Sequence, residues 1–268
     1  MEFKILGSGG AFPTPRAFCQ CEICVEARST GKNKRNSSCF FIKDINGLVD
    51  CPEDINDSLN SHFIEKVEHV FITHFHPDHT FGLRVLLESV YDYYTKTQEI
   101  PVNVYMAENV YESLKKIFLA EFLFEIKKKG NLIFIKNNET VHINNTIVTA
   151  VGYQGDNSEV YAFLFEKDNQ KALYAPCDTI KFERSSEFIN LDLLVNEIGI
   201  FSHDICKKEI SFPDLMTRLE NMKPKRIILT HIEECELRKW GLEHLENLKK
   251  KYPQIPFEFA HDGLDINI

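Results

Sequence analysis

Short apolar runs, some of them alternating with polar residues, predict β-strands along most of the chain. Residues 3–6 fit one short strand, residues 38–42 and 47–50 fit a hairpin pair, and residues 68–73 fit a buried strand because they are largely apolar. Further strands are predicted at residues 102–106, 132–135, 146–151, 160–166 and 172–174. Both halves of the chain are therefore rich in strands.

Helical periodicity separates several of these strands. Apolar side chains between residues 81 and 94 follow a spacing of three and four, which predicts an amphipathic helix. Residues 53–63 and 108–126 also fit helices, and helices alternate with strands toward the C-terminus. No repeat or linker is evident, so residues 1–268 are predicted to form a single domain. An α/β fold with two sheets packed face to face and helices outside would suit this pattern.

The balance of charge narrows the classes of partner. Acidic residues outnumber basic ones by 40 to 31, and the net charge of -9 disfavours a long nucleic acid as the ligand. The short basic runs at residues 32–35 and 127–129 are interpreted as solvated faces or loops. A small anionic substrate is compatible with this charge if bound metals supply the positive charge.

The N-terminal residues and the cysteines indicate the compartment. Residues 1–4 lead directly into the first strand, without the apolar stretch of a signal peptide, and no segment is long enough to span a membrane. We therefore expect a cytoplasmic protein that does not bind membranes. The eight cysteines are then expected to be thiols or metal ligands rather than disulfides.

Four candidate metal ligands lie within six positions where the strand at residues 68–73 ends. They are His74, His76, Asp78 and His79. In an extended backbone His74 and His76 point the same way, whereas Asp78 and His79 lie where the chain turns into the next helix. Ligands this close in sequence do not easily surround one ion, so we predict two adjacent metals. Imidazole and carboxylate groups favour zinc and also accept manganese or iron.

The motif His-x-His-x-Asp-His at residues 74–79 is the hallmark of the metallo-β-lactamase superfamily, which this chain resembles. The resemblance covers nearly the whole chain. It includes Gly7-Ser8-Gly9-Gly10 after the first strand, Asp50, Asp178, His231 and the closing Asp262-Gly263. The fold of the family is a four-layer αββα sandwich with the metals at one edge. The resemblance therefore implies this fold and a metal-dependent hydrolase.

The resemblance also implies roles for individual residues. It assigns ligands to two catalytic metals, namely His74 and His76 to the first, Asp78, His79 and His231 to the second, and Asp178 to both as a bridge. Without the resemblance, Asp178 would be interpreted as a turn or helix cap and His231 as a structural histidine. Asp78 and Asp178 would orient a metal-bound hydroxide that attacks the substrate.

One ligand expected for the family is missing. The superfamily normally supplies a third histidine to the first metal from the loop after a strand such as residues 146–151, but the corresponding residues 152–157 contain none. Asp156 is the candidate substitute because zinc accepts carboxylates, although acidic residues are also common at loop tips. If nothing substitutes, the protein uses one metal or binds the first metal weakly.

A second candidate metal site is formed by Cys19, Cys21 and Cys24. Their spacing, in a loop at residues 16–36, suits a structural zinc and would strain any disulfide among the three thiols. Closed zinc sites are almost always four-coordinate, so we predict Cys235 as the fourth ligand.

The cysteine cluster is similar to that of the PhnP-type branch, the phosphodiesterases of phosphonate breakdown that open ribose cyclic phosphates. In that branch the cluster shares zinc with a histidine just after the last catalytic histidine, and Glu234 occupies that position here. The pyrroloquinoline quinone biosynthesis protein B branch carries a similar cluster and is the main alternative. A ribonuclease Z-like role in transfer RNA processing is disfavoured because the chain has neither a long basic arm nor a positive net charge.

The expected activity is therefore that of a phosphodiesterase acting on a small phosphodiester or cyclic phosphate. His203 is a candidate to protonate the leaving group, and a purely structural role is the alternative for it. The expected cofactors are two catalytic divalent metals and one structural zinc. A homodimer is compatible with the resemblance. The main alternative activity is that of a metal-containing oxidoreductase or pathway protein of the quinone-biosynthesis type.

Overall fold

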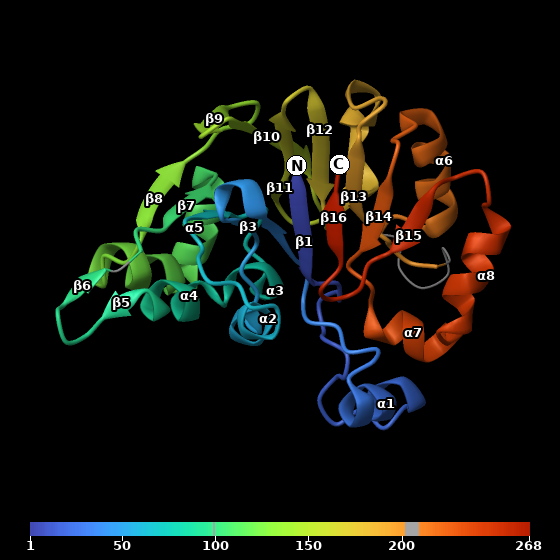
Figure 1. The fold of residues 1–268 in the computed structure, drawn as a ribbon, viewed down its shortest axis with the longest axis horizontal. Coiled ribbons are helices and arrows are strands. Elements are labelled where there is room, and N and C mark those ends of the chain that lie inside the picture. Colours follow the sequence, from blue (N-terminus) through green and yellow to red (C-terminus); the bar gives the residue numbers. More distant parts are fainter. Residues whose placement is uncertain (99, 202–208) are drawn as a thin grey trace.

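The chain folds into two β-sheets that lie face to face, with helices on the outer side of each sheet. The computed structural model describes residues 1–98, 100–201 and 209–268. Figure 1 shows one half of the chain in blue and green and the other in yellow and red, with both termini where the halves meet. The predicted four-layer αββα sandwich is thereby confirmed.

The first sheet is built mainly from the N-terminal half of the chain. Its strands are β1 (Glu2–Gly7), β2 (Cys39–Ile42), β3 (Gly47–Val49), β4 (His69–Phe71), β7 (Asn103–Met106), β8 (Asn131–Phe134) and β16 (Asp265–Asn267). They lie in the order β16-β1-β2-β3-β4-β7-β8, and β3, β4, β7 and β8 run parallel. Because parallel strands end at the same edge, the residues that follow β3 and β4 lie together.

The second sheet contains the later strands. These are β9 (Thr140–Ile143), β10 (Thr146–Gln154), β11 (Glu159–Lys167), β12 (Gln170–Ala175), β13 (Leu193–Glu197), β14 (Ile227–Thr230) and β15 (Phe257–Phe259). They lie in the order β15-β14-β13-β12-β11-β10-β9, with β12 to β15 parallel. The chain therefore leaves β12 and β14 at the same edge of this sheet.

Helices cover the outer face of each sheet. The half with the first sheet holds α2 (Ile55–Ser61), α3 (Pro77–Thr80), α4 (Leu83–Ser89) and α5 (Glu108–Lys116), and the other half holds α6 (Phe212–Met222), α7 (Glu234–Trp240) and α8 (Glu243–Lys251). In Figure 1, α1 (Glu22–Thr30) lies apart from both sheets, and it contacts α7. The remaining elements are a π-helix at Glu121–Ile126, 3₁₀-helices at Lys43–Ile45, Thr179–Lys181 and Glu183–Glu187, and a hairpin of β5 (Tyr91–Asp92) and β6 (Thr97–Gln98).

The side chains of β11 show how the core is divided. Phe163 and Phe165 pack between the two sheets, whereas Leu164 packs toward the helices over the second sheet, as the two-residue period of a strand requires. Between the sheets, Tyr174 of β12 stacks on Phe40 of β2 with the ring centroids 4.7 Å apart. This packing fixes the two sheets, and hence the loops at their ends, relative to each other.

Two of the predicted helices are shorter in the structure. The helix predicted at residues 81–94 is α4, which ends at Ser89 because the chain then enters the β5–β6 hairpin. The helix predicted at residues 108–126 is α5, which ends at Lys116 and is followed by the π-helix Glu121–Ile126. Apolar residues continue through both breaks, so the spacing of apolar residues did not reveal them.

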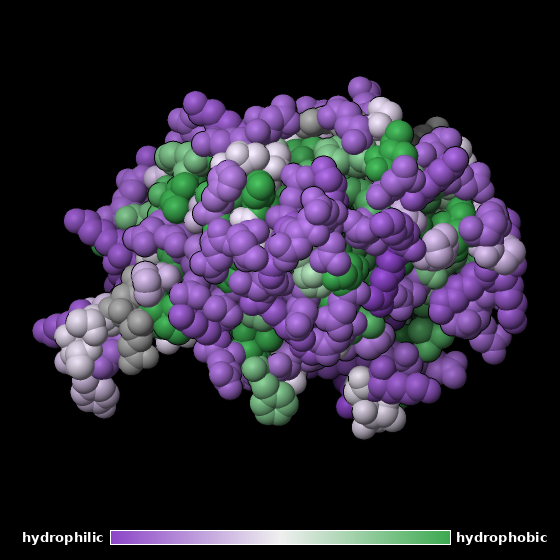
Figure 2. Space-filling view, turned by 45° about the horizontal axis from the view of Figure 1, so that its top comes forward, coloured by the Kyte–Doolittle hydropathy of each residue, from purple (hydrophilic) through white to green (hydrophobic). Residues whose placement is uncertain are grey.

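The face of the molecule in Figure 2 is mainly hydrophilic. Hydrophobic residues appear there as small patches between polar side chains. Within the described ranges, no helix combines the length and the apolar character needed to cross a membrane. The residues with distinctive chemistry lie in loops that follow strands and around α1 and α7.

Candidate metal centres

The loop after β4 carries the predicted histidine cluster. Tyr161 of β11 donates its backbone N–H to the carbonyl of Thr73 at 2.9 Å, so this loop lies against the second sheet. α3 then begins at Pro77, whose fixed φ suits the first turn of a helix. The turn into α3 places Asp78 and His79 beside the end of β4.

Asp50 supports this loop from the end of β3. It is fully buried and adopts a φ of 65°. Its carboxylate accepts hydrogen bonds from the N–H and the hydroxyl of Thr73, each at 2.9 Å, and lies 2.7 Å from Nδ1 of His79. A carboxylate on one ring nitrogen fixes the orientation of a histidine whose other nitrogen binds a metal. Asp50 therefore leaves Nε2 of His79 directed at the site.

His74 and His76 form one half of the site. Nε2 of His74 lies 2.9 Å from Nδ1 of His76, and the hydroxyl of Thr73 lies 2.9 Å from Nδ1 of His74. Burial lowers the pKa of His74 well below its usual range, and His79 lowers it further. Burial also lowers the pKa of His76. Both rings therefore favour the neutral form, which is the form that binds a metal.

Asp78, His79 and His231 form the other half, and with His74 and His76 they make up what we call the histidine centre. Oδ2 of Asp78 lies 3.2 Å from Nε2 of His79 and 3.7 Å from Nε2 of His231. Both nitrogens are buried, and neither makes a hydrogen bond with any residue that the structure describes. Two such imidazole nitrogens beside a carboxylate are a donor set for a divalent metal. The residues thus fit the metal that the sequence motif implies.

The same three residues also shift one another's pKa values. Burial opposes charge on Asp78, but His79 and His231 hold the pKa of this carboxyl below its usual range. Burial would lower the pKa of His79, yet Asp78 and Asp50 raise it well above its usual value. The three residues therefore favour a positive charge between them, carried either by protons on the imidazoles or by a metal ion.

Cys177 and Asp178 reach the histidine centre from the end of β12. Sγ of Cys177 and one nitrogen each of His74 and His79 lie within 4.8 Å of one another. Asp178, the predicted bridge, belongs to no group of this kind among the residues that the structure describes. Burial lowers the pKa of His76, and the charge of Asp178 acts in the opposite direction.

Asp156, the predicted substitute for the missing histidine, lies in the loop between β10 and β11. Its backbone N–H donates to Oδ2 of Asp178 at 3.4 Å. Gly155 permits this close approach, since a Cβ there would lie 2.9 Å from the same oxygen. Over the described ranges, Asp156 does not join the histidines in a group of metal-ligand size. Its assignment as a ligand stays a prediction.

The cysteine cluster forms a second centre between α1 and α7, which we call the cysteine centre. The Sγ atoms of Cys19, Cys21 and Cys24 lie 3.2, 3.7 and 3.3 Å from Oε1 of Glu234. Arg16 lies 3.4 Å from the other oxygen of this carboxylate. Burial raises the pKa of the Cys24 thiol to about 12, so a thiolate there requires a neighbouring cation. Three sulfurs and one carboxylate are a four-ligand set of the kind that suits zinc.

The predicted fourth ligand of this centre is corrected from Cys235 to Glu234. Cys235 is exposed and lies outside the group. Glu234 is the first residue of α7, and the next residue of a helix points about 100° further round its axis. The loop predicted at residues 16–36 also contains α1, which places Cys24 in a helical turn.

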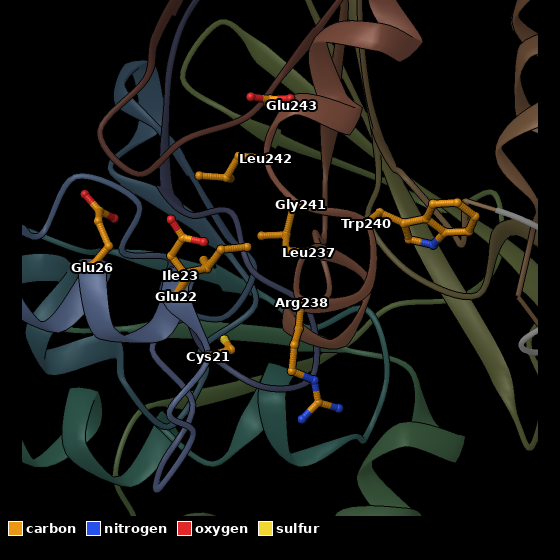
Figure 3. Close-up of a pocket in the computed structure, with 10 residues that line it drawn as sticks. All are labelled: Cys21, Glu22, Ile23, Glu26, Leu237, Arg238, Trp240, Gly241, Leu242 and Glu243. Carbon is orange, nitrogen blue, oxygen red and sulfur yellow. The ribbon is translucent and has the colours of Figure 1, made fainter.

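A pocket of about 400 Å³ lies beside the cysteine centre, between α1 and the chain from α7 to α8 (Figure 3). Cys21 lies on its wall, and the side chains of Ile23 and Leu237 approach each other across it. The ring of Trp240 points away from this group (Figure 3). None of the residues that line the pocket belongs to the histidine centre, so the two centres have separate surroundings.

A short segment of chain links the two centres. Glu233 Oε1 lies 3.5 Å from Nδ1 of His231 and accepts a hydrogen bond from the N–H of Ala11 at 3.0 Å. Glu234 follows and enters the cysteine centre. The cysteine centre therefore anchors the segment that carries His231.

Sequence reasoning assigned no role in the histidine centre to Asp50 as a support or to Cys177. The sequence feature that could have identified Asp50 is its position directly after the apolar residues 47–49. A carboxylate at the end of a buried strand needs polar partners. Nothing in the sequence around Cys177 distinguishes it from a buried core cysteine. His203, the candidate proton donor, lies outside the described residues.

Several solved structures have folds similar to that of this chain. The Zn²⁺-bound PqqB from Methylobacterium extorquens has a TM-score of 0.80 and 16% identity, with 100% of each chain covered. A diphosphatase of the PhnP family has a TM-score of 0.78 and 20% identity, with 100% of this chain and 97% of that chain covered. The short form of human tRNase Z has a TM-score of 0.67 and 18% identity, covering 100% of this chain and 99% of that one. At such identities these likenesses show the fold alone.

A match to a family model assigns the chain to a protein family. No curated protein matches the chain significantly. The family model described as the beta-lactamase superfamily domain matches residues 46–232, which include the histidine loop, Cys177, Asp178 and His231. Since this match spans well over half of the chain and the αββα sandwich agrees with it, the protein belongs to the beta-lactamase superfamily and has the metallo-β-lactamase fold.

Proposed function

We propose that this protein is a metal-dependent phosphodiesterase that acts on a small phosphodiester or a cyclic phosphate. The observation that carries the proposal is the pair of adjacent half-sites in the histidine centre. Pairs of divalent metals are used by many enzymes that hydrolyse phosphate esters. The shared fold with a PhnP-family diphosphatase supports the choice of a phosphate substrate.

The proposed chemistry divides between the metals and the chain. When bound, divalent metals supply an activated water and neutralise negative charge on the phosphoryl group. Asp50 holds the ring of His79, and Asp78 and Asp178 would orient the attacking water by accepting its hydrogen bonds. Because the chain carries a net charge of -9, a small anionic substrate depends on the positive charge of this centre, and a long nucleic acid is disfavoured.

Metal content and turnover test the proposal together. Metals per chain are measured by mass spectrometry for the wild type, for the double variant His76→Ala/Asp178→Ala and for Cys235→Ser as a control on the exposed cysteine. Each protein is also assayed with an aryl phosphodiester in zinc and in manganese. We expect about three metals and turnover in the wild type and the control, and about one metal without turnover in the double variant. About one metal and no turnover in all three proteins would contradict the proposal.

The alternative is a metalloprotein of the quinone-biosynthesis type without phosphodiesterase activity. Two observations favour it, namely the TM-score of 0.80 with PqqB and the absence of a histidine from residues 152–157. Iron or copper in the histidine centre, with no phosphodiester turnover in any divalent metal, would support this alternative. Turnover of the aryl phosphodiester would exclude it.

A further inference from the structure

Cys177 is the sulfur-bearing residue of the histidine centre. It follows β12 at the edge of the second sheet, and its side chain is 6% exposed. The hydroxyl of Tyr153 donates to the carbonyl of Cys177, which fixes the backbone at this residue. The position of its Sγ is therefore set by the second sheet, while the histidine loop belongs to the first.

The sulfur lies between the two half-sites. Its group includes His74 from one half and His79 from the other, with the three ligand atoms within 4.8 Å of one another. Nε2 of His79 and of His231 are buried without a hydrogen bond, which is a second sign of a ligand site at the same place.

Asp178 has different partners. Its Oδ2 accepts a hydrogen bond from the backbone N–H of Asp156 at 3.4 Å, and within the described part of the chain the carboxylate belongs to no group of three or more candidate ligands. It caps the 3₁₀-helix Thr179–Lys181 in a left-handed conformation with a φ of 53°. Cys177, and not Asp178, is therefore the residue at the end of β12 that forms a group of metal-ligand size with histidines of both half-sites.

We propose that Cys177 is a thiolate ligand of the catalytic metal centre, in the bridging place between the half-sites. This inference rests on the proposed metal site at the histidine centre. As the metal–sulfur bond forms, the thiol proton is released to solvent, so metal uptake is accompanied by proton release. A soft thiolate favours zinc over manganese, which prefers oxygen ligands.

Outside the cysteine centre, the two other buried cysteines that the structure describes have surroundings that suit the core. Sγ of Cys39 donates to the carbonyl of Asp50 at 3.4 Å, and Cys51 packs in the same apolar cluster. Neither joins a group of imidazole nitrogens in the described residues. Burial raises the pKa of both thiols well above the usual value, so they stay protonated. Cys177 thus differs from them by its imidazole neighbours, not by its burial.

Cobalt spectroscopy tests the proposal without requiring turnover. Wild-type protein is stripped of metal, its cysteine centre is filled with one equivalent of zinc, and Co²⁺ is then added to the histidine centre. We expect the added cobalt to produce a sulfur-to-cobalt charge-transfer band in the near ultraviolet. The band should be absent from Cys177→Ser, with cobalt bound at least about 10-fold more weakly, and retained in Cys235→Ser.

The outcomes separate this proposal from the proposed function. Cobalt that binds the histidine centre without a sulfur band, or that fails to bind there, would overturn the ligand role of Cys177. Phosphodiester turnover in that same protein would leave the proposed function intact. A sulfur band without phosphodiester turnover would support Cys177 as a ligand and contradict the proposed function. If Cys177→Ser does not fold, the presence or absence of the band in the wild type still tests the ligand role of Cys177. Cys177→Asp should then restore metal binding, with a stronger preference for manganese over zinc than in the wild type.

Discussion

The histidine centre and the cysteine centre differ in how the chain assembles them. The histidine centre draws on residues that follow β3, β4, β12 and β14, so both sheets must be packed before its ligand atoms meet. The cysteine centre needs the loop at Cys19–Cys24 and one residue of α7, and its three thiols converge on Oε1 of Glu234. The histidine centre therefore forms only when the whole fold has formed, whereas the cysteine centre joins two neighbouring segments.

This difference indicates different tasks. The cysteine centre offers the four ligands that a closed zinc site needs, and a metal held by all four would have no place for a substrate. The histidine centre instead gathers more polar groups than one ion needs and supports them with a carboxylate from behind. The two sheets hold this centre in place, and its additional polar groups suit a reaction. Changes in the first centre should therefore affect stability most, and changes in the second should affect turnover most.

The largest expected effect is on turnover. Asp78 lies between His79 and His231, and Asp78→Asn removes the charge while keeping the shape of the side chain. We expect kcat for an aryl phosphodiester to fall by about 10³-fold, since several kcal/mol of electrostatic stabilisation is lost. The control is Asp57→Asn on exposed α2, and equal kcat for the two variants would show that the histidine centre is not the catalytic one.

The next effect is on stability. Glu234→Ala removes one of four groups from the cysteine centre, and we expect zinc to be lost from this centre. The free energy of unfolding should fall by about 3 kcal/mol when free zinc exceeds the dissociation constant 100-fold. Urea unfolding with and without zinc measures this difference. Glu234→Cys should retain zinc, and Cys235→Ser should match the wild type. A zinc-dependent loss of unfolding free energy in Cys235→Ser would instead indicate that Cys235 is the fourth ligand.

The sequence predicted the parts of each centre that are local in the chain. His74, His76, Asp78 and His79 lie on one bend between a strand and a helix, so their spacing alone indicated a metal site. The layered fold followed from strand and helix periodicity together with the resemblance. The ends of α4 and α5 were not predictable in this way, because apolar residues continue past the points where these helices stop.

The parts that depend on tertiary contacts were harder to predict. Whether Cys177 or Asp178 forms a group with the histidines depends on how the chain after β12 meets the histidine loop across the two sheets. The choice between Glu234 and Cys235 depends on the rotation of α7 about its axis. In both cases the sequence located the segment, and packing selected the residue.

A smaller effect is expected from the support behind the histidine centre. Asp50→Asn keeps the volume and an oxygen that can accept the two hydrogen bonds from Thr73, but it replaces the charged oxygen beside Nδ1 of His79. We expect metal affinity at the histidine centre to fall by about 10- to 100-fold, as is typical when the partner of a ligating histidine is replaced. Competition with a chelator measures it. Zinc at the cysteine centre should be unaffected, and a parallel loss there would mean that Asp50 supports the whole fold.

The smallest effect comes from a carboxylate outside both centres. Oδ2 of Asp54 accepts a hydrogen bond from the N–H of Ser37 at 2.8 Å, and burial raises the pKa of Asp54 from 3.8 to about 6. Because the folded pKa lies above the unfolded one, the protonated carboxyl stabilises the fold at acid pH, and this contribution is lost as the pH rises through about 6. It amounts to about 1 kcal/mol between pH 5 and pH 7.

Asp54→Asn should remove that contribution, which urea unfolding of variant and wild type at the two pH values would show. Asp57 is the matched control because Lys34 and Asn36 lower its pKa, so its contribution has the opposite sign and is lost only as the pH falls below its unfolded value. If Asp54→Asn and the wild type change equally between the two pH values, Asp54 is ionised throughout. The acid dependence of stability would then belong to the two centres, whose ligands release their metals as they are protonated.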